Sequence, residues 1–209
     1  MEIFKRPADS NKDHYEAVGQ ALSRRRVIRL RGPITPIPYR VDVYGPSTVE
    51  DMIMEFQAED DTKPIWLIID SPGGDVETGF ALYDTMKLAT APIYTVGQSC
   101  ASMAATILAA GNKGRRYVMQ NCRTMIQPPS GQVSGTTNEV RNAVEQMEQM
   151  RDRIIQAYID CGVTKSKKQI QNDWVLDYWL DAHAVIKYGL ADRIMDTEDF
   201  REMLNPSNG

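Results

Sequence analysis

Strand-like and helix-like patterns of hydrophobic residues alternate along the middle of the chain. Strand-like apolar segments occur at 27–30, 65–69 and 92–96, and the last two are each followed by apolar residues at helical spacing, over 76–86 and 104–110. Shorter strand patterns follow at 117–119 and 124–126. Such alternation predicts an α/β fold, built from repeated βα units with a largely parallel sheet and helices packed over it.

Further helices are indicated by capping residues. Ser47 and Glu50 have capping-box spacing, which predicts a helix that ends at the acidic run 59–61. Asp181 can cap a helix over 182–188, which Gly189 terminates.

A long apolar stripe covers 137–160 and predicts a helix of about six turns, closed by Cys161 and Gly162. A helix of this length rarely finds enough core in a chain of 209 residues. Its outer, Met-rich part is therefore predicted to pack on another subunit. The alternative is a helix that packs entirely within its own chain.

The length and the 42% hydrophobic content suit a single core. We expect an N-terminal arm at 1–23, one domain at 24–196 with a projecting handle at about 127–160, and a C-terminal tail at 197–209. The arm is polar and mixed, and is predicted to be mobile or ordered by a partner. Prolines between 33 and 46 hold about a dozen residues out of any helix, and 39–44 can form an edge strand.

Composition narrows the function classes. The net charge of -4 argues against nucleic acid as the main partner, and the arginine cluster at 24–31 is assigned to flanking or intersubunit salt bridges. Three cysteines without a CxxC pair suit a reducing compartment, and no zinc or other metal site and no cofactor is indicated. The chain shows neither a signal-peptide core nor an apolar run of membrane-spanning length, so we expect a cytoplasmic protein.

Two stretches can carry chemistry. In 97–106, small residues surround Ser102 between a strand and a helix, where unpaired N–H groups favour developing negative charge. In 70–75, Gly73 and Gly74 follow a buried strand and can aim N–H groups at a carbonyl or an oxyanion. The structural alternatives are a tightly packed strand–helix junction and a glycine turn that closes a βα unit.

Asp177 lies in an unusually aromatic stretch, 174–180. An acid held in such surroundings is expected to be hydrogen-bonded, because an unpaired buried carboxylate costs several kcal/mol. The two histidines, His14 and His183, are interpreted as surface or packing residues.

Taken together, five motifs occur in the order and spacing of a known family. They are Ile69-Asp70-Ser71-Pro72-Gly73-Gly74, Tyr83-Asp84-Thr85-Met86, Gly97-Gln98 leading to Ala101-Ser102-Met103-Ala104, Arg123-Thr124-Met125-Ile126, and Tyr188-Gly189-Leu190-Ala191-Asp192. Over about 26–194, the chain resembles the proteolytic subunit of the caseinolytic (Clp) protease. The resemblance implies a crotonase-like fold and a serine peptidase that needs no cofactor.

The resemblance also implies an assembly. Family members stack two seven-membered rings into a homo-oligomeric barrel with the active sites inside and the long helix as the ring-to-ring handle. An ATP-driven unfoldase of the AAA+ class docks outside and feeds in unfolded polypeptides. The arm at 1–23 and the proline-rich segment at 33–46 differ from the family's usual pattern.

The site roles implied by the resemblance fall on particular residues. Ser102 is similar to the nucleophile and Asp177 to the acid that orients the base, while the N–H groups of Gly73 and Met103 match the oxyanion hole. The implied substrate-binding residues are Gly74, Ser130, Gly131 and Gln132, the last three in a polar ribbon at 130–135.

The chain departs from the family where the general base belongs. The family has a histidine directly after the Met-Ile pair, and this chain has Gln127. A neutral carboxamide is too weak a base near pH 7 to take the serine proton, although it can form hydrogen bonds in the histidine's place between Ser102 and Asp177. We therefore predict that the chain, with glutamine at position 127, is inactive as a peptidase.

Three interpretations stay open. Gln127 is either an inactivating substitution in a protease, which the intact Ser102, Asp177 and glycine turn favour, or the mark of a natural non-catalytic subunit with a structural or regulatory place in a mixed ring. The third, disfavoured by the Ser102 and Asp177 motifs, is an acyl-CoA enzyme of the crotonase type.

Overall fold

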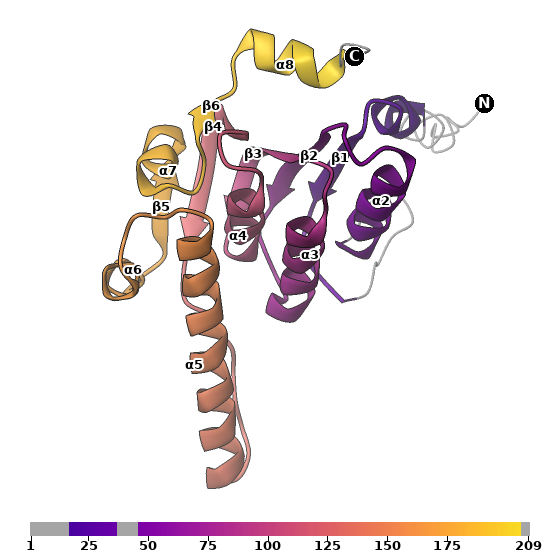
Figure 1. Cartoon of the computed structure of the whole chain (residues 1–209). Helices are drawn as coiled ribbons and strands as arrows, with labels where there is room; N and C mark the ends of the chain where they lie inside the picture. Colours follow the sequence, from indigo (N-terminus) through magenta and orange to yellow (C-terminus); the bar gives the residue numbers. More distant parts are fainter. Residues whose placement is uncertain (1–16, 37–45, 206–209) are drawn as a thin grey trace, which may run out of the picture.

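The computed structural model describes residues 17–36 and 46–205 (Figure 1). His14, the edge strand expected at 39–44 and most of the expected N-terminal arm lie outside these residues. The end of the arm, 17–23, is helical, and Leu22 packs against the domain.

A mixed sheet forms the centre of the α/β fold, in the order β1-β2-β3-β4-β5, with β6 also paired to β4. The strands are β1 (Val27–Arg31), β2 (Ile65–Ser71), β3 (Ile93–Ala101), β4 (Arg116–Ile126), β5 (Tyr178–Asp181) and β6 (Arg193–Ile194). β1 to β4 are parallel, β6 runs parallel to β4, and β5 runs antiparallel to it. The predicted parallel-dominated sheet is confirmed.

Helices cover both faces of this sheet. They are α2 (Pro46–Glu59), α3 (Val76–Leu88), α4 (Met103–Ala110), α5 (Thr137–Asp160), α6 (Lys167–Asp173), α7 (Ala182–Tyr188) and α8 (Thr197–Leu204). The larger apolar cluster joins one face of the sheet to residues of α2, α3 and α4. On the other face, Trp66 and Tyr117 pack with Met203 of α8.

Two strands are longer than predicted. β4 is one strand where two short ones, 117–119 and 124–126, were expected, because exposed polar residues at 120–121 interrupt the apolar pattern without ending the strand. β3 continues to Ala101, past the predicted end at 96, since its small residues go on pairing with both neighbours beyond an irregularity at Gly97. The turn between β3 and α4 therefore consists of Ser102 alone.

Two capped helices were not predicted. The charge run at 165–168 contains Ser166, which caps α6 in a capping box with Gln169. The expected tail contains α8, which Asp196 caps together with Asp199. Both segments are mainly polar and their helices are short, so their caps outweigh a weak hydrophobic pattern.

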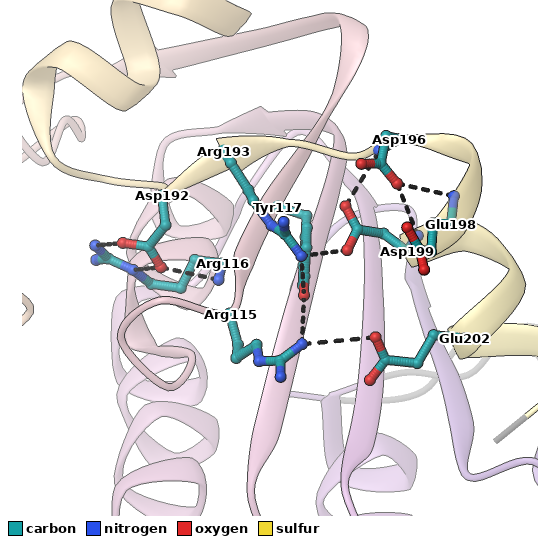
Figure 2. Close-up of polar contacts among 9 residues, drawn as sticks. All are labelled: Arg115, Arg116, Tyr117, Asp192, Arg193, Asp196, Glu198, Asp199 and Glu202. Carbon is teal, nitrogen blue, oxygen red and sulfur yellow. Dashed lines mark hydrogen bonds and ion pairs between the residues drawn. The ribbon is translucent and has the colours of Figure 1, made fainter. Parts of the chain in front are cut away.

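Side chains from β4, from β6 and from the residue before β4 hold α8 in place (Figure 2). Arg193 is ion-paired with the buried Asp199, and the Tyr117 hydroxyl accepts hydrogen bonds from Arg193 at 3.3 Å and Arg115 at 3.2 Å. Arg115 also lies 3.6 Å from the Glu202 carboxylate. Residues 197–204 are thus part of the folded domain.

Two arginines of the basic cluster make hydrogen bonds within the chain. The Arg26 guanidinium donates to the carbonyl oxygens of Phe56 (2.7 Å) and Asp60 (2.8 Å) at the C-terminal end of α2. Arg25 donates to the Leu204 carbonyl oxygen (2.6 Å) at the end of α8. Both supply donors to carbonyls that a helix end leaves unpaired.

The predicted long helix is confirmed with its bounds, and α5 projects from the body of the molecule (Figure 1). Its 24 residues span about 36 Å at 1.5 Å per residue. Its buried residues all lie near the C-terminal end: Ile154, Ile155, Ala157 and Tyr158. Intramolecular packing therefore accounts for only the last part of the helix.

None of the helices in the described part of the chain is long and apolar enough to cross a membrane.

Candidate active site

Ser102 stands alone between β3 and α4, in a backbone conformation that non-glycine residues rarely adopt. Its φ of 54° and ψ of -124° place it in a strained region, at a cost of about 1–3 kcal/mol. Its N–H donates to the Met125 carbonyl oxygen at 2.7 Å, which helps to hold the turn. A serine on such a turn, at a helix N-terminus, is typical of a nucleophile.

The glycine turn after β2 fits directly against Ser102. A Cβ atom built on Gly73, whose φ is +83°, would lie 2.4 Å from the Ala101 carbonyl oxygen, 2.8 Å from the Ser102 Cβ and 2.9 Å from the Met103 nitrogen. No side chain fits at those distances, so glycine is required for this approach.

Strand register brings the other two predicted residues to the same place. β3 pairs Ala101 with Met125, and β4 pairs Ile126 with Tyr178. Ser102, Gln127 and Asp177 are the next residues at that end of three neighbouring strands. Gln127 and Asp177 also line a common pocket of about 490 Å³. Its other walls are Pro128, Ser130, Trp174, Val175 and Leu176.

These three side chains are not connected by hydrogen bonds. Within the part of the chain that the structure describes, neither the Ser102 hydroxyl nor the Gln127 carboxamide nor the Asp177 carboxylate has a hydrogen-bond partner. The expected hydrogen bond of Asp177 is absent among these described residues, because Asp177 is exposed and not enclosed by its aromatic neighbours. Trp174 packs edge-on against Tyr158 instead, with ring centroids 6.0 Å apart.

Two backbone N–H groups are unpaired in this region, one next to the serine in the chain and one in the glycine turn. Met103 is the first residue of α4, and its N–H has no partner among the described residues. Gly73 N–H, in contrast, donates to the Ser71 hydroxyl oxygen at 3.1 Å. In the glycine turn, the N–H group without a hydrogen-bond partner among the described residues is that of Gly74.

A short bridge fixes the orientation of Gly74. The Ile34 N–H donates to the Gly73 carbonyl oxygen, and the Asp75 N–H donates to the Ile34 carbonyl oxygen, both at 2.9 Å. In such a parallel bridge the polar backbone groups of Gly74 point away from Ile34. No sequence pattern pointed to Ile34, and Ser71 was noted only as a member of the glycine motif.

The predicted substrate-binding ribbon, 130–135, follows the end of β4, and its backbone is unpaired. No backbone–backbone hydrogen bond involves 128–135, a stretch within the described residues, and Ser130, Gly131 and Gln132 are exposed. An extended segment with free N–H and C=O groups can pair with another extended chain.

Other candidate groups stay apart from this chemistry. His183 is exposed on α7. Burial raises the pKa of the Cys100 thiol well above its usual range, which keeps this neighbour of Ser102 protonated and unreactive. No group of three metal-ligating side chains lies together within residues 17–36 and 46–205.

A strained serine between a parallel strand and a helix, beside a glycine turn with a free N–H, is an arrangement that α/β hydrolases with a serine nucleophile use. The Clp protease family model matches residues 10–198, and the chain belongs to the Clp protease family.

Curated relatives agree with this assignment. The chain is 33% identical over 181 residues to an ATP-dependent Clp protease proteolytic subunit 2 from Bifidobacterium longum, covering 80% of this chain and 87% of that protein. It is 33% identical over 183 residues to an ATP-dependent Clp protease proteolytic subunit from Streptococcus mutans, covering 86% of this chain and 89% of that protein. Membership in this family replaces the third interpretation, an acyl-CoA enzyme of the crotonase type.

Proposed function

We propose that this chain is a Clp-type serine endopeptidase subunit whose active site is inactive as written, because Gln127 stands where the general base belongs. The observation that carries the proposal is the strained Ser102 turn, packed against Gly73 with Gln127 and Asp177 at the ends of the neighbouring strands. The substrate is an unfolded polypeptide, delivered by an ATP-dependent unfoldase into a barrel of two stacked heptameric rings.

Attack by Ser102 on a peptide carbonyl creates an oxyanion. We assign its stabilisation to the N–H groups of Met103 and Gly74, since the Gly73 N–H is already bonded to Ser71. Each such donor contributes about 3–4 kcal/mol in the transition state. Gly73 serves this site through its small size, which lets the turn reach Ser102.

Proton transfer is the step that the chain lacks. The serine proton has to move to a base and later to the leaving amine, and a neutral carboxamide does neither near pH 7. The remaining groups bind the peptide along the open ribbon that contains Ser130, Gly131 and Gln132, so the site holds polypeptide without cleaving it at a working rate.

Covalent labelling tests this function. A fluorophosphonate probe is expected to label the Gln127→His variant on the peptide that contains Ser102, once per chain, and to leave the unaltered chain unlabelled over the same time. Mass spectrometry after digestion locates the label, and Gln127→His combined with Ser102→Ala is the control. A Gln127→His variant that folds and stays unlabelled would overturn the proposal.

A non-catalytic place in a mixed ring is the second candidate. It is favoured by the absence, in the described part of the chain, of any hydrogen bond that links Ser102, Gln127 and Asp177. Both candidates require assembly through the exposed part of α5, where Val144 is 49% exposed.

Assembly gives a separate prediction. Native mass spectrometry at micromolar concentration is expected to find ring-sized oligomers of the unaltered chain, and Val144→Asp is expected to shift them to smaller species, since it places a charge on the exposed helix face. A matched change on the exposed surface of α3, Leu88→Asp, provides the control. A stable monomer of the unaltered chain contradicts the handle proposal.

A further inference from the structure

Ser71 is a polar side chain that the proposed chemistry leaves without a role. It ends β2, pairs in register with Cys100 and is 2% exposed. Its hydroxyl oxygen accepts the Gly73 N–H at 3.1 Å, across Pro72. A buried hydroxyl that bonds the backbone two residues on stabilises a turn of defined shape.

The glycine turn is held from two sides. Ser71 holds the Gly73 N–H, while the Ile34 backbone holds the Gly73 carbonyl oxygen and the Asp75 N–H, each at 2.9 Å. Gly73 and Gly74 have φ values of +83° and +150°, which glycine adopts easily but does not hold without such contacts. The two bonds to Ile34 fix the peptide planes on both sides of Gly74, and the bond to Ser71 fixes the plane between Pro72 and Gly73.

We propose that Ser71 is a positioning residue of the catalytic site. By taking the Gly73 N–H, its hydroxyl fixes the peptide plane between Pro72 and Gly73 and leaves the Gly74 N–H, which points away from Ile34, as the free donor of the turn. Without that acceptor, the Gly73 N–H is free to compete for the substrate carbonyl, and the turn that presents the Gly74 N–H is held by the Ile34 backbone alone. Ser71 acts through the backbone and touches no reacting atom.

Kinetics test the inference in the Gln127→His background, and this arm rests on the proposed function. Ser71→Ala is expected to lower kcat for peptide hydrolysis about tenfold with KM unchanged, less than the roughly 10²–10³ lost with a whole oxyanion donor. Ser71→Thr keeps the hydroxyl and is expected to restore kcat to within about threefold of the Gln127→His parent.

The matched control removes another buried hydroxyl. Thr95 is fully buried and donates to the Leu108 carbonyl oxygen at 2.8 Å, away from the glycine turn. Thr95→Val is expected to match the loss of thermal stability in Ser71→Ala without lowering kcat. An equal fall in kcat for both variants would reduce Ser71 to a merely structural residue and overturn the inference.

Hydrogen–deuterium exchange tests the same inference without Gln127→His. In the unaltered chain, a peptide that spans 72–75 reports a change mainly at Gly73, because Pro72 has no amide hydrogen, the unpaired Gly74 N–H has no bond to lose, and the Asp75 N–H is bonded to Ile34. Ser71→Ala is expected to speed exchange there and leave flanking peptides unchanged. Unchanged protection of the Gly73 amide would overturn the role of Ser71. If the Gln127→His variant is inactive, the proposed function fails, and the exchange result alone then decides whether Ser71 positions the turn.

Discussion

Replacement of Gln127 by histidine is expected to raise the rate of peptide hydrolysis by about 10³-fold or more. Position 127 follows Ile126 at the end of β4, between the strand that ends before Ser102 and the strand that begins after Asp177. An imidazole there can take the serine proton and return it to the leaving amine, and Asp177 can orient it. General base catalysis contributes about 10²–10⁴ in rate, and its loss leaves only residual catalysis.

The pH dependence identifies the restored base. An unperturbed imidazole has a pKa of about 6.5, so kcat/KM of the Gln127→His variant is expected to rise between about pH 5.5 and 7.5. Gln127→Asn is the matched control, because it changes the side chain without supplying a base. A rate that is equal in the histidine and asparagine variants would show that position 127 is not the base position.

Truncation of Asp192 is expected to reduce the free energy of unfolding by about 3 kcal/mol. Arg116 is 2% exposed, and it donates to the Asp192 carboxylate from Nε at 3.0 Å and from a second nitrogen at 2.6 Å (Figure 2). It also donates to the carbonyl oxygens of Ala109 and Cys161, so the pair joins α4, α5 and the start of β4. Removing one partner leaves a buried charge uncompensated, which costs about 3–5 kcal/mol; the 17% exposure of the carboxylate favours the lower end.

Urea unfolding of Asp192→Ala at fixed protomer concentration measures this loss. Asp152→Ala removes a carboxylate from exposed ion pairs with Arg151 and Lys167, and it is expected to leave the urea midpoint unchanged. Equal midpoints for Asp192→Ala and the unaltered chain would contradict the role given to the buried pair.

The same carboxylate makes stability depend on pH. Burial alone would raise the pKa of Asp192, but the hydrogen bonds from Arg116 and Gly114 outweigh it and hold the pKa below its usual range. A carboxylate with a pKa below the unfolded value of about 3.9 stabilises the fold fully above that value. The contribution is lost as the pH falls through the folded-state pKa, and Asp192→Asn is expected to lack this acid-dependent loss.

Periodicity and caps were enough to predict much of the fold. The apolar run 65–69 and the stripe over 137–160 gave β2 and α5, and Asp181 with Gly189 gave the bounds of α7. These features are local, because a strand buried on both faces or a long amphipathic helix leaves its pattern in consecutive residues. The short polar helices α6 and α8 were missed because their caps alone marked them.

The site residues also divide into those that a local sequence pattern marks and those that it does not. Ser102 and Gly73 were found from a local surrounding of small residues, whereas Gln127 and Asp177 required the resemblance to a family. Strand pairing brings those two residues together from 50 positions apart, and no local pattern encodes it. The exposure of Asp177 and the bond between Ser71 and Gly73 depend on how turns pack, which composition does not predict.

In the proposed function, Ser102 is a prepared nucleophile whose general base is missing. Hydrolysis of one fluorogenic peptide by four proteins tests it most directly: the unaltered chain, Gln127→His, and each of these with Ser102→Ala. We predict turnover only in Gln127→His, about 10³-fold above the other three. Turnover in the unaltered chain that disappears with Ser102→Ala, or turnover in Gln127→His that survives it, would contradict the claim.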